Sequence, residues 1–484
     1  MSRAKEVGIR KTVGAGRGGL VGQFLTEAML LTSLATLIAL PAAWLALPLY
    51  RTLAGKAIPA HPLGDPAVLA AIAVGAVLLG LLAGTYPAFV LSSFRPTQVL
   101  KGTFVSSGSG LRKAMVAFQF MMSIVLIAGT VVVHEQLGFL RSHPLGFEDR
   151  QQLVVDFGGD PRVREEIEAI EQELEAMPTV AAVSVTRSVP GGYFPGASTI
   201  VEAPDGSMLE IDFGLFEVDH EFLTQLGVDV AAGRLFSAEM ETDAEEALIV
   251  NAAAARAVGY ADPSDIVGKR FRQWGREGSI VGVVGDFNVE SLHNEVAPLS
   301  FRVSPWLRFL VLEIATSDAS AAVEQIQARW NELVPYRPFL YTFLDQSFDA
   351  LYRAEDRFGA LFGTFAALAI FIACLGLFGL AAYSVQQRTK EIGIRKALGA
   401  TAGSVARLFS RDFLKLVLIG FVAAVPVAYF VMSRWLEGFA YRIELGPGVF
   451  LMAGGLALLV AVITVSYQSA RAARLDPVRT LRYE

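Results

Sequence analysis

The chain alternates between long apolar stretches and polar segments. Six stretches contain no charged side chain, at residues 28–50, 67–94, 114–133, 358–387, 416–433 and 445–470. A helix rises about 1.5 Å per residue, so about 20 residues cross a hydrocarbon core of about 30 Å. Five stretches reach that length, and Phe413 and Leu414 extend the shortest one. Buried helices of soluble proteins rarely stay free of charge for so long, so the pattern predicts six transmembrane helices.

The long polar region at residues 135–357 has a different pattern, typical of a mixed α/β domain. Runs with strand character lie at residues 152–157, 180–186, 209–218, 279–284 and 309–315. Apolar residues at helical spacing predict amphipathic helices over 162–177 and 319–333. Because a strand–helix–strand pattern occurs at both ends of the region, we expect two subdomains. The polar residues 135–150 and 345–357 adjoin predicted spans and would extend those helices as a stalk.

Charge separates the segments into two groups. Apolar residues make up 53% of the chain and charged residues 18%, and the net charge is only −6. Four segments, 1–19, 95–113, 388–415 and 471–484, hold 20 of the 41 Lys and Arg residues. Residues 135–357 hold 17 Lys and Arg against 38 Asp and Glu, a net charge of −21. Since basic residues mark cytoplasmic loops, we expect a multi-pass protein of the cell (inner) membrane, with both termini in the cytoplasm and residues 135–357 outside.

One basic segment occurs twice. Residues 3–15 (RAKEVGIRKTVGA) and 388–400 (RTKEIGIRKALGA) share nine of thirteen positions at a constant offset of 385. Two predicted spans follow each copy, and a weaker match then places Pro96 on Pro477 and Leu100 on Leu481. The repeated unit is therefore a basic segment, two spans and a Pro-x-x-x-Leu tail. The glycine pairs Gly80–Gly84 and Gly359–Gly363 either allow close helix contacts or are ordinary glycines of membrane helices.

Signatures of catalysis and of ion transport are scarce. The glycine-rich residues 14–19 have neither the following Lys-Ser/Thr nor the preceding strand of a phosphate-binding loop. The five histidines are scattered without metal-ligand spacing, and Cys374 is the single cysteine. The predicted spans carry ionisable residues only at their edges, at Glu27 and Lys415. We therefore expect no catalytic residues, no cofactor and no metal in this chain, and an energy source on another subunit.

The repeated basic segment has two interpretations. Lys and Arg beside a span can simply anchor it in the membrane, in which case only their charge matters. The two copies, however, keep the same Glu, both Gly residues, one Ile and the order of the charges. In the second copy, Glu391 and Arg395 are four residues apart and would lie side by side on a helix. This favours docking to a specific protein.

These features identify a family. Residues 388–400, the following two spans and the tail at Pro477 and Leu481 resemble the permease subunits of the type VII ABC transporters, the MacB/FtsX/LolC-like superfamily. The segment 279–301 (SIVGVVGDFNVESLHNEVAPLSF) is similar to the periplasmic core domain of MacB-type proteins, and residues 116–126 open a repeat as in that family. The layout most resembles the duplicated FtsX-like permeases with two four-span repeats.

The resemblance implies a membrane protein with an α-helical bundle of six spans and one mixed α/β extracytoplasmic domain of the MacB periplasmic-core type. Residues 1–102 would be the C-terminal part of a first FtsX-like repeat, with coupling segment 3–19 and spans 20–50 and 67–94. A transmembrane helix at 111–134 and a MacB-like extracytoplasmic domain at 135–357 would follow. Residues 358–484 would be a second permease domain, with spans 358–387, 413–433 and 445–470 and coupling segment 388–411. The repeat abuts Met1, so we expect that the N-terminal span, ectodomain and span of the first repeat are missing.

The resemblance also implies that each basic segment is a coupling helix resting on a cytoplasmic ABC ATPase dimer. In the second copy the contact residues would be Lys390, Glu391, Ile392, Gly393, Ile394, Arg395, Lys396, Ala397, Leu398, Gly399 and Ala400. In the first copy they would be Lys5, Glu6, Gly8, Ile9, Arg10, Lys11, Gly14 and Ala15. ATP and Mg would bind the partner ATPase. The family further suggests a periplasmic adaptor or outer-membrane component, and no nucleic acid.

Two functions are consistent with these features. The first is the permease subunit of an ATP-driven transporter that exports or extracts lipids, lipoproteins, peptides or drugs by mechanotransmission. The second is an FtsX-type signalling subunit that controls an extracytoplasmic partner without transport. A sensor receptor is disfavoured because no kinase, cyclase or methyl-accepting segment follows any span.

Overall fold

The computed structural model describes residues 7, 10–55, 64–92, 109–147, 151–387, 394, 398 and 402–473. The chain divides into two compact units. The membrane unit contains residues up to 131 together with 357–428 and 447–484, and the outer unit contains residues 132–356 and 429–446.

Six helices of the described residues are long and apolar enough to span a membrane, which confirms the six predicted spans. They are α2 (Arg17–Ala54), α3 (Pro66–Ser92), α5 (Ser109–Ser142), α13 (Arg353–Gln387), α15 (Ala402–Leu436) and α16 (Pro447–Ala473). Each is longer than its charge-free stretch or similar to it in length, because the helices continue into polar residues. The predicted extension into residues 135–150 is helical as far as Ser142, where α5 ends.

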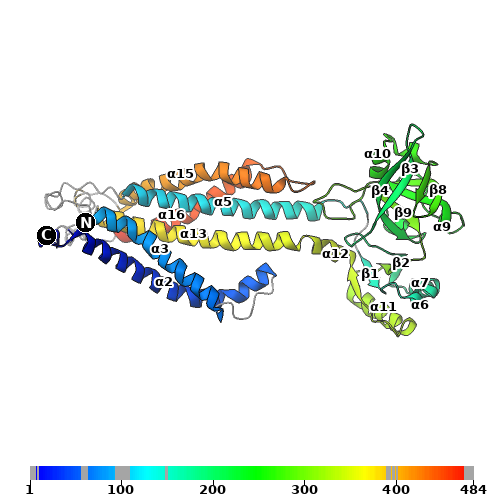
Figure 1. Cartoon of the computed structure of the whole chain (residues 1–484), viewed down its shortest axis with the longest axis horizontal. Coiled ribbons are helices and arrows are strands. Elements are labelled where there is room, and N and C mark those ends of the chain that lie inside the picture. The colour runs from blue at the N-terminus through cyan, green and yellow to red at the C-terminus, as the bar shows by residue number, and fades with distance from the viewer. Residues whose placement is uncertain are drawn as a thin grey trace. The chain divides into compact units, whose positions relative to one another are not determined.

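Glycines set how closely the helices of the membrane unit pack. A Cβ atom at Gly420 of α15 would lie 2.8 Å from the carbonyl oxygen of Ala117 and 3.1 Å from the amide nitrogen of Met121, both on α5. The helices α2 and α3 lie side by side (blue in Figure 1), and a Cβ at Gly80 would lie 2.6 Å from Thr32 Oγ1. At Gly84 it would lie 2.9 Å from the Cβ of Ala28. The pair Gly80–Gly84 therefore does permit a close helix contact.

The outer unit contains one 11-stranded sheet with short helices. Its strands are β1 (Gln152–Asp156), β2 (Val180–Thr186), β3 (Gly196–Glu202), β4 (Met208–Val218), β5 (Val230–Gly233), β6 (Ala247–Asn251), β7 (Arg270–Gln273), β8 (Arg276–Val284), β9 (Leu299–Val303), β10 (Phe309–Ile314) and β11 (Tyr341–Phe343). Its helices are α6 (Pro161–Glu165), α7 (Ile167–Glu175), α8 (Phe222–Gln225), α9 (Asp243–Glu246), α10 (Ala252–Val258), η2 (Pro263–Ile266), α11 (Ala319–Leu333) and α12 (Leu344–Leu351). The mixed α/β class is confirmed.

The two ends of the domain form one subdomain, which we call the terminal subdomain. Its strands run in the order β11-β1-β10-β2 and are antiparallel. Side chains of α7 and α11 share one core with this sheet, around the fully buried Trp330, Phe157 and Leu310. The expectation that the two strand–helix–strand ends are separate subdomains is therefore wrong. Each βαβ-like unit has an apolar face that one helix alone does not cover, so the two units combine.

The middle of the domain forms a second subdomain, which we call the barrel subdomain. The strands follow the order β4-β3-β7-β8-β6-β9, and β9 also pairs with β4, which closes the ring. Gln273 is buried, and its side chain donates hydrogen bonds to Thr199 Oγ1 at 2.7 Å and Ser300 Oγ at 3.0 Å. A single residue pair, Thr186 with Val218, joins β2 to β4 and so links the two subdomains in one sheet.

The expected elements differ from the structure in two respects. The helix expected over 162–177 is broken at Glu166, where α6 ends and α7 begins. Six strands were not expected, namely β3, β5, β6, β7, β9 and β11. Both β6 and β9 are buried along their whole length, so they lack the polar–apolar alternation that marks a half-exposed strand.

Candidate functional site

The structure describes only part of the expected coupling segments. In the second copy it includes Ile394 and Leu398, whose side chains are exposed. The amide of Leu398 donates to the carbonyl oxygen of Ile394 at 3.0 Å, which is the spacing of a helical turn. The other expected contacts of this copy lie outside the described residues: Lys390, Glu391, Ile392, Gly393, Arg395, Lys396, Ala397, Gly399 and Ala400.

In the first copy Arg10, Lys11, Gly14 and Ala15 are described, and Lys5, Glu6, Gly8 and Ile9 lie outside the described residues. The guanidinium of Arg10 donates to Gln23 Oε1 at 2.6 Å, and Ala15 N–H donates to the Arg10 carbonyl at 2.9 Å. Val7, which was not among the expected contacts, is buried against Leu20 and Phe24 of α2 and Ala88 of α3. One face of this segment is thus attached to the first pair of spans.

The loop between α15 and α16, residues 437–446, is held by a set of contacts that we call the clasp. The buried side chain of Gln136 on α5 donates to the carbonyl of Tyr441 at 2.8 Å and accepts from the amide of Ile443 at 2.9 Å. The Ala440 amide donates to the carbonyl of His293, in the loop after β8, at 3.0 Å. The clasp therefore connects the barrel subdomain to the loop between the last two spans.

The ring of His293 is central to the clasp. It stacks on Phe439 with a centroid distance of 3.9 Å. Its Nδ1 lies 3.2 Å from the carbonyl oxygen of Gly438, and its Nε2 lies 3.0 Å from Glu355 Oε1. Both neighbours are acceptors, so both hydrogen bonds form at once only when the ring carries two N–H groups.

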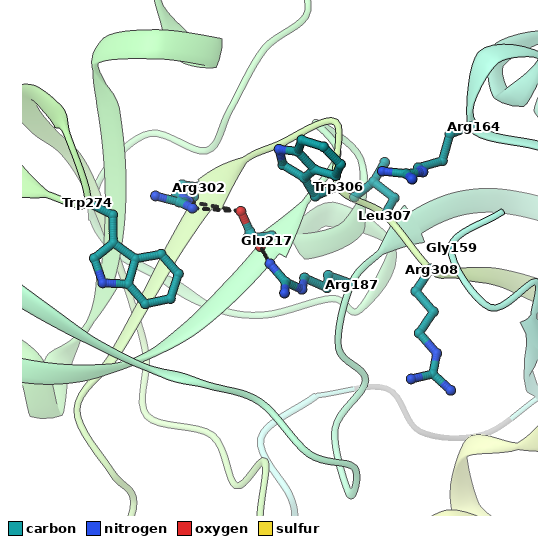
Figure 2. A pocket seen from close by; sticks show the side chains of 9 residues that line it. All are labelled: Gly159, Arg164, Arg187, Glu217, Trp274, Arg302, Trp306, Leu307 and Arg308. Atoms are coloured by element: carbon teal, nitrogen blue, oxygen red, sulfur yellow. Dashed lines mark hydrogen bonds and ion pairs between the residues drawn. The ribbon is translucent and has the colours of Figure 1, made fainter. Parts of the chain in front are cut away.

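A cationic pocket of about 470 Å³ opens where the two subdomains meet (Figure 2). The terminal subdomain contributes Arg164 from α6 and Arg187 from the end of β2. The barrel subdomain contributes Glu217, Arg302 and Trp274. The remaining lining residues are Gly159, Trp306, Leu307 and Arg308. A pocket of this size accommodates a small organic molecule.

Glu217 organises the arginines of this pocket. Its carboxylate is almost fully buried and accepts from Arg302 Nη2 at 2.7 Å, from Ser304 Oγ at 2.9 Å and from Arg187. Burial acts to raise the pKa of Glu217, but the hydrogen bonds from Arg302, Arg187 and Ser304 outweigh it, so the pKa is lowered. Glu217 is therefore ionised, and two arginines share its one negative charge.

Two tryptophans form the walls of the pocket, and each supports an arginine. The guanidinium of Arg302 lies 5.3 Å from the ring centre of Trp274, and that of Arg164 lies 4.9 Å from the ring centre of Trp306. Both indoles are more than half exposed. Trp274 occupies the tight turn between β7 and β8 with a φ of 46°, in the left-handed region where Asn or Gly is usual.

A second, acidic cavity of about 410 Å³ shares Arg164 and Leu307 with this pocket. It contains Glu168, Glu171 and Asp219. Burial raises the pKa of Glu171 to about 8, and the negative charges of Asp219, Glu175, Glu168 and Glu221 add to the rise. Glu171 is therefore largely neutral at pH 7.

The pocket was not predicted from the sequence. One local signal could have drawn attention to it, because residues 302–308 (RVSPWLR) concentrate two arginines and a tryptophan in a domain with a net charge of −21. Among the residues that the structure describes, no cluster of His, Cys, Asp and Glu could hold a metal ion.

Comparison with known proteins identifies the membrane segments. A family model described as FtsX-like permease C-terminal matches residues 1–96 and 363–477, which contain both copies of the basic segment and the two spans after each. These two regions of the chain therefore resemble the FtsX-like permease domain. The repeat found in the sequence thus corresponds to two matches of a single permease domain.

One relative is named as an ABC transporter permease, and two are named as export ATP-binding/permease proteins. The permease YknZ of Bacillus subtilis is 31% identical over 130 residues, which cover 26% of this chain and 31% of the relative. The pyoverdine export protein PvdT of Pseudomonas fluorescens is 30% identical over 35% of this chain and 26% of the relative. The macrolide export protein MacB of Chromobacterium violaceum is 22% identical over 57% of this chain and 44% of the relative. The chain therefore spans less than half the length of each of these relatives.

Solved structures match the outer unit of the chain. The periplasmic region of MacB from Actinobacillus actinomycetemcomitans matches 42% of this chain and 93% of that region, with 13% identity and a TM-score of 0.31. The extracellular domain of the transporter YknZ matches 40% of this chain with 11% identity and a TM-score of 0.29.

Proposed function

We propose that this chain is the transmembrane subunit of an ATP-driven transporter, in which a separate cytoplasmic ATPase moves the extracytoplasmic domain. The observation that carries the proposal is the repeated basic segment, with its nine identities in thirteen positions. A dimeric ATPase offers two equivalent surfaces, and a chain with two copies of one segment can engage both. The ATPase dimer would bind ATP and Mg, which supply the energy for the cycle.

In this proposal the coupling residues are those of the two segments, Lys5–Ala15 and Lys390–Ala400, and both termini lie in the cytoplasm. The exposed Ile394 and Leu398 would insert apolar side chains into the ATPase surface. Glu391 and Arg395 would add charged contacts beside them.

The clasp would transmit a displacement driven by the ATPase to the outer domain. Helix α15 begins at Ala402, two residues after the second coupling segment, and the clasped loop follows its other end. A displacement of α15 would therefore reach the barrel subdomain through Gln136 and His293. The absence of charged residues inside the apolar stretches supports a mechanical role over an ion pathway.

Export is the form of transport that the relatives' names favour, since two of them are named for export of pyoverdine or macrolides. The substrate would be a lipid, lipoprotein, peptide or drug taken from the outer side of the membrane. A periplasmic adaptor or an outer-membrane component would complete the path.

The test removes the charged pair of the second coupling segment. We expect the double variant Glu391→Ala/Arg395→Ala to abolish the ATP hydrolysis that co-purifies with the tagged full chain, while membrane insertion stays unchanged. The control is Arg272→Ala/Glu277→Ala, which removes an exposed ion pair of 3.9 Å between β7 and β8, away from both the coupling segments and the clasp. Unchanged ATP hydrolysis in the first variant would refute the docking role, as would a wild-type chain that brings no ATPase with it.

A further inference from the structure

The cationic pocket is unexpected in this domain. Residues 135–357 carry 38 acidic and 17 basic side chains, yet four arginines and one glutamate line the pocket. Asp156, outside the lining, pairs with Arg308 through two hydrogen bonds of 3.1 and 2.8 Å. The four arginines and these two carboxylates together carry a net charge of +2, and the acidic cavity lies on the other side of Arg164 and Leu307. Arg276, which is outside the lining, donates to the carbonyl of Val303 at 2.8 Å and interacts electrostatically with Arg302.

The arginines keep hydrogen-bonding capacity that the protein does not use. Each guanidinium has five N–H donors. Glu217 is shared between Arg187 and Arg302, and the side chain of Arg187 is 45% exposed. Among the described residues, Arg164 has no carboxylate within 4.0 Å, and its Nε is buried without a hydrogen-bond acceptor. The pocket therefore presents donors that an incoming anion would satisfy.

The two tryptophans of the pocket contribute little to the stability of the fold. Trp306 is 62% exposed and Trp274 is 51% exposed, so neither contributes much to a core. The left-handed backbone at Trp274 disfavours a bulky side chain by about 1–2 kcal/mol relative to glycine. A large aromatic ring kept at such a position, beside an arginine, is typical of a recognition surface.

We propose that this pocket binds a small organic oxyanion, a carboxylate or phosphate carried on a planar ring, and that the bound anion bridges the terminal and barrel subdomains. Arg164 and Arg187 would bond its oxygens from one side and Arg302 from the other, because guanidinium groups match the geometry of carboxylates and phosphates. The ring would pack against the exposed indoles of Trp274 and Trp306. The pocket lies in the outer unit, so this binding does not depend on the proposed coupling to an ATPase.

The two subdomains give the bound anion a mechanical consequence. Within the sheet, one residue pair joins β2 to β4. Outside the strand pairing, the ion pair of Arg187 with Glu217 already crosses this junction, and a ligand held by arginines of both subdomains would add to these connections. Occupancy would therefore favour one relative orientation of the two subdomains.

The binding test uses the full chain in phosphatidylcholine nanodiscs and titration calorimetry with three probes. Phenyl phosphate has both the ring and the oxyanion, inorganic phosphate has only the oxyanion, and benzyl alcohol has only the ring. We expect saturable binding of phenyl phosphate, about tenfold weaker binding of inorganic phosphate, and no saturable heat with benzyl alcohol. No saturable binding of phenyl phosphate, or equal binding of benzyl alcohol, would overturn the proposal.

Two variants separate the contributions of charge and ring. Arg164→Gln should weaken both phosphate probes about tenfold, because one charge-assisted hydrogen-bonding group is lost. Trp306→Ala should weaken phenyl phosphate about fivefold and inorganic phosphate by clearly less, because Arg164 loses the indole that supports it but keeps its charge. Arg272→Gln, an exposed arginine of β7 outside the pocket, is the control and should bind as the wild type does.

If either variant fails to fold, Arg164→Lys and Trp306→Phe replace it. Lys keeps the charge but loses the forked donors, so phosphate affinity should still fall, by less than in Arg164→Gln. Affinity of Arg164→Gln or Arg164→Lys equal to that of the wild type would overturn the assignment of Arg164.

Discussion

Different interactions stabilise the interior of the membrane unit and the interior of the outer unit. In the membrane unit, helices pack where glycine removes the side chain, as at Gly420 against α5 and Gly80 against α2. In the outer unit, buried charged groups join strands that are distant in sequence, as Glu217 and Arg302 do, or close loops, as Arg234 and Asp243 do with bonds of 2.6 and 2.7 Å. Inside a bilayer burial from water no longer drives helices together, so close contact between small residues does.

The difference predicts that the two units respond to different perturbations. The membrane unit should be sensitive to added volume at its glycines and insensitive to pH. The outer unit should be sensitive to the loss of a carboxylate and to pH.

The largest effect is expected from Glu217→Ala. The substitution leaves Arg302, whose side chain is 10% exposed, without its carboxylate. Removing one partner of a buried ion pair lowers the free energy of unfolding by about 3–5 kcal/mol. The midpoint of thermal unfolding of the full chain in detergent, followed by near-ultraviolet circular dichroism, measures it. Glu210→Ala, an exposed carboxylate of the same strand β4, should have little effect; equal effects of the two would mean that the buried network does not stabilise the outer unit.

The next effect concerns the membrane unit. Gly420→Leu should destabilise the packing of α15 on α5 by about 1–3 kcal/mol, because the added side chain meets backbone atoms of Ala117 and Met121 that cannot move aside alone. Gly455→Leu is the matched control, since a Cβ there meets no atom within 4 Å. Unfolding in mixed micelles with increasing dodecyl sulfate measures both. A Gly420→Leu variant as stable as Gly455→Leu would contradict the proposed role of close packing.

The pH dependence should arise in the outer unit. The pKa of Glu171 is raised from 4.5 to about 8, so between these values the folded chain binds more protons than the unfolded chain. Stability from this group is therefore present at pH 5 and is lost as the pH rises towards 8. We expect Glu171→Gln to flatten this part of the profile of unfolding midpoint against pH. Glu324→Gln, at an exposed site on α11, should keep the wild-type slope, and a wild-type profile that rises from pH 5 to 8 would contradict the assignment.

The smallest effect is a gain in stability. Trp274→Asn places at φ 46° a residue that favours the left-handed region, and Gly275 follows it in the turn. The free energy of unfolding should rise by about 1 kcal/mol, while binding of phenyl phosphate weakens. A more stable variant that binds phenyl phosphate more weakly would show that the left-handed turn at Trp274 serves ligand binding. If stability falls instead, the indole supports the fold.

The sequence alone predicted those features that depend on local pattern. The six spans follow from charge-free length, and Val180–Thr186 and Ala319–Leu333 were expected with the bounds that the structure has. The repeated segment was visible because both copies keep the same residues at one offset. Each of these properties depends on about 10–30 consecutive residues, and over this range the length and periodicity of apolar residues indicate the type of element.

Only the tertiary structure decided which distant segments meet. The two ends of the outer domain form one sheet because β1 pairs with both β10 and β11, about 160 to 190 residues further along the chain. The barrel closes through the pairing of β4 with β9, and the same pairing positions Arg302 beside Glu217. Strand pairing depends on which apolar faces can be buried together, and no local pattern encodes it. The cationic pocket, built from α6, β2, β4, the β7–β8 turn, β9 and the following loop, is a product of that pairing.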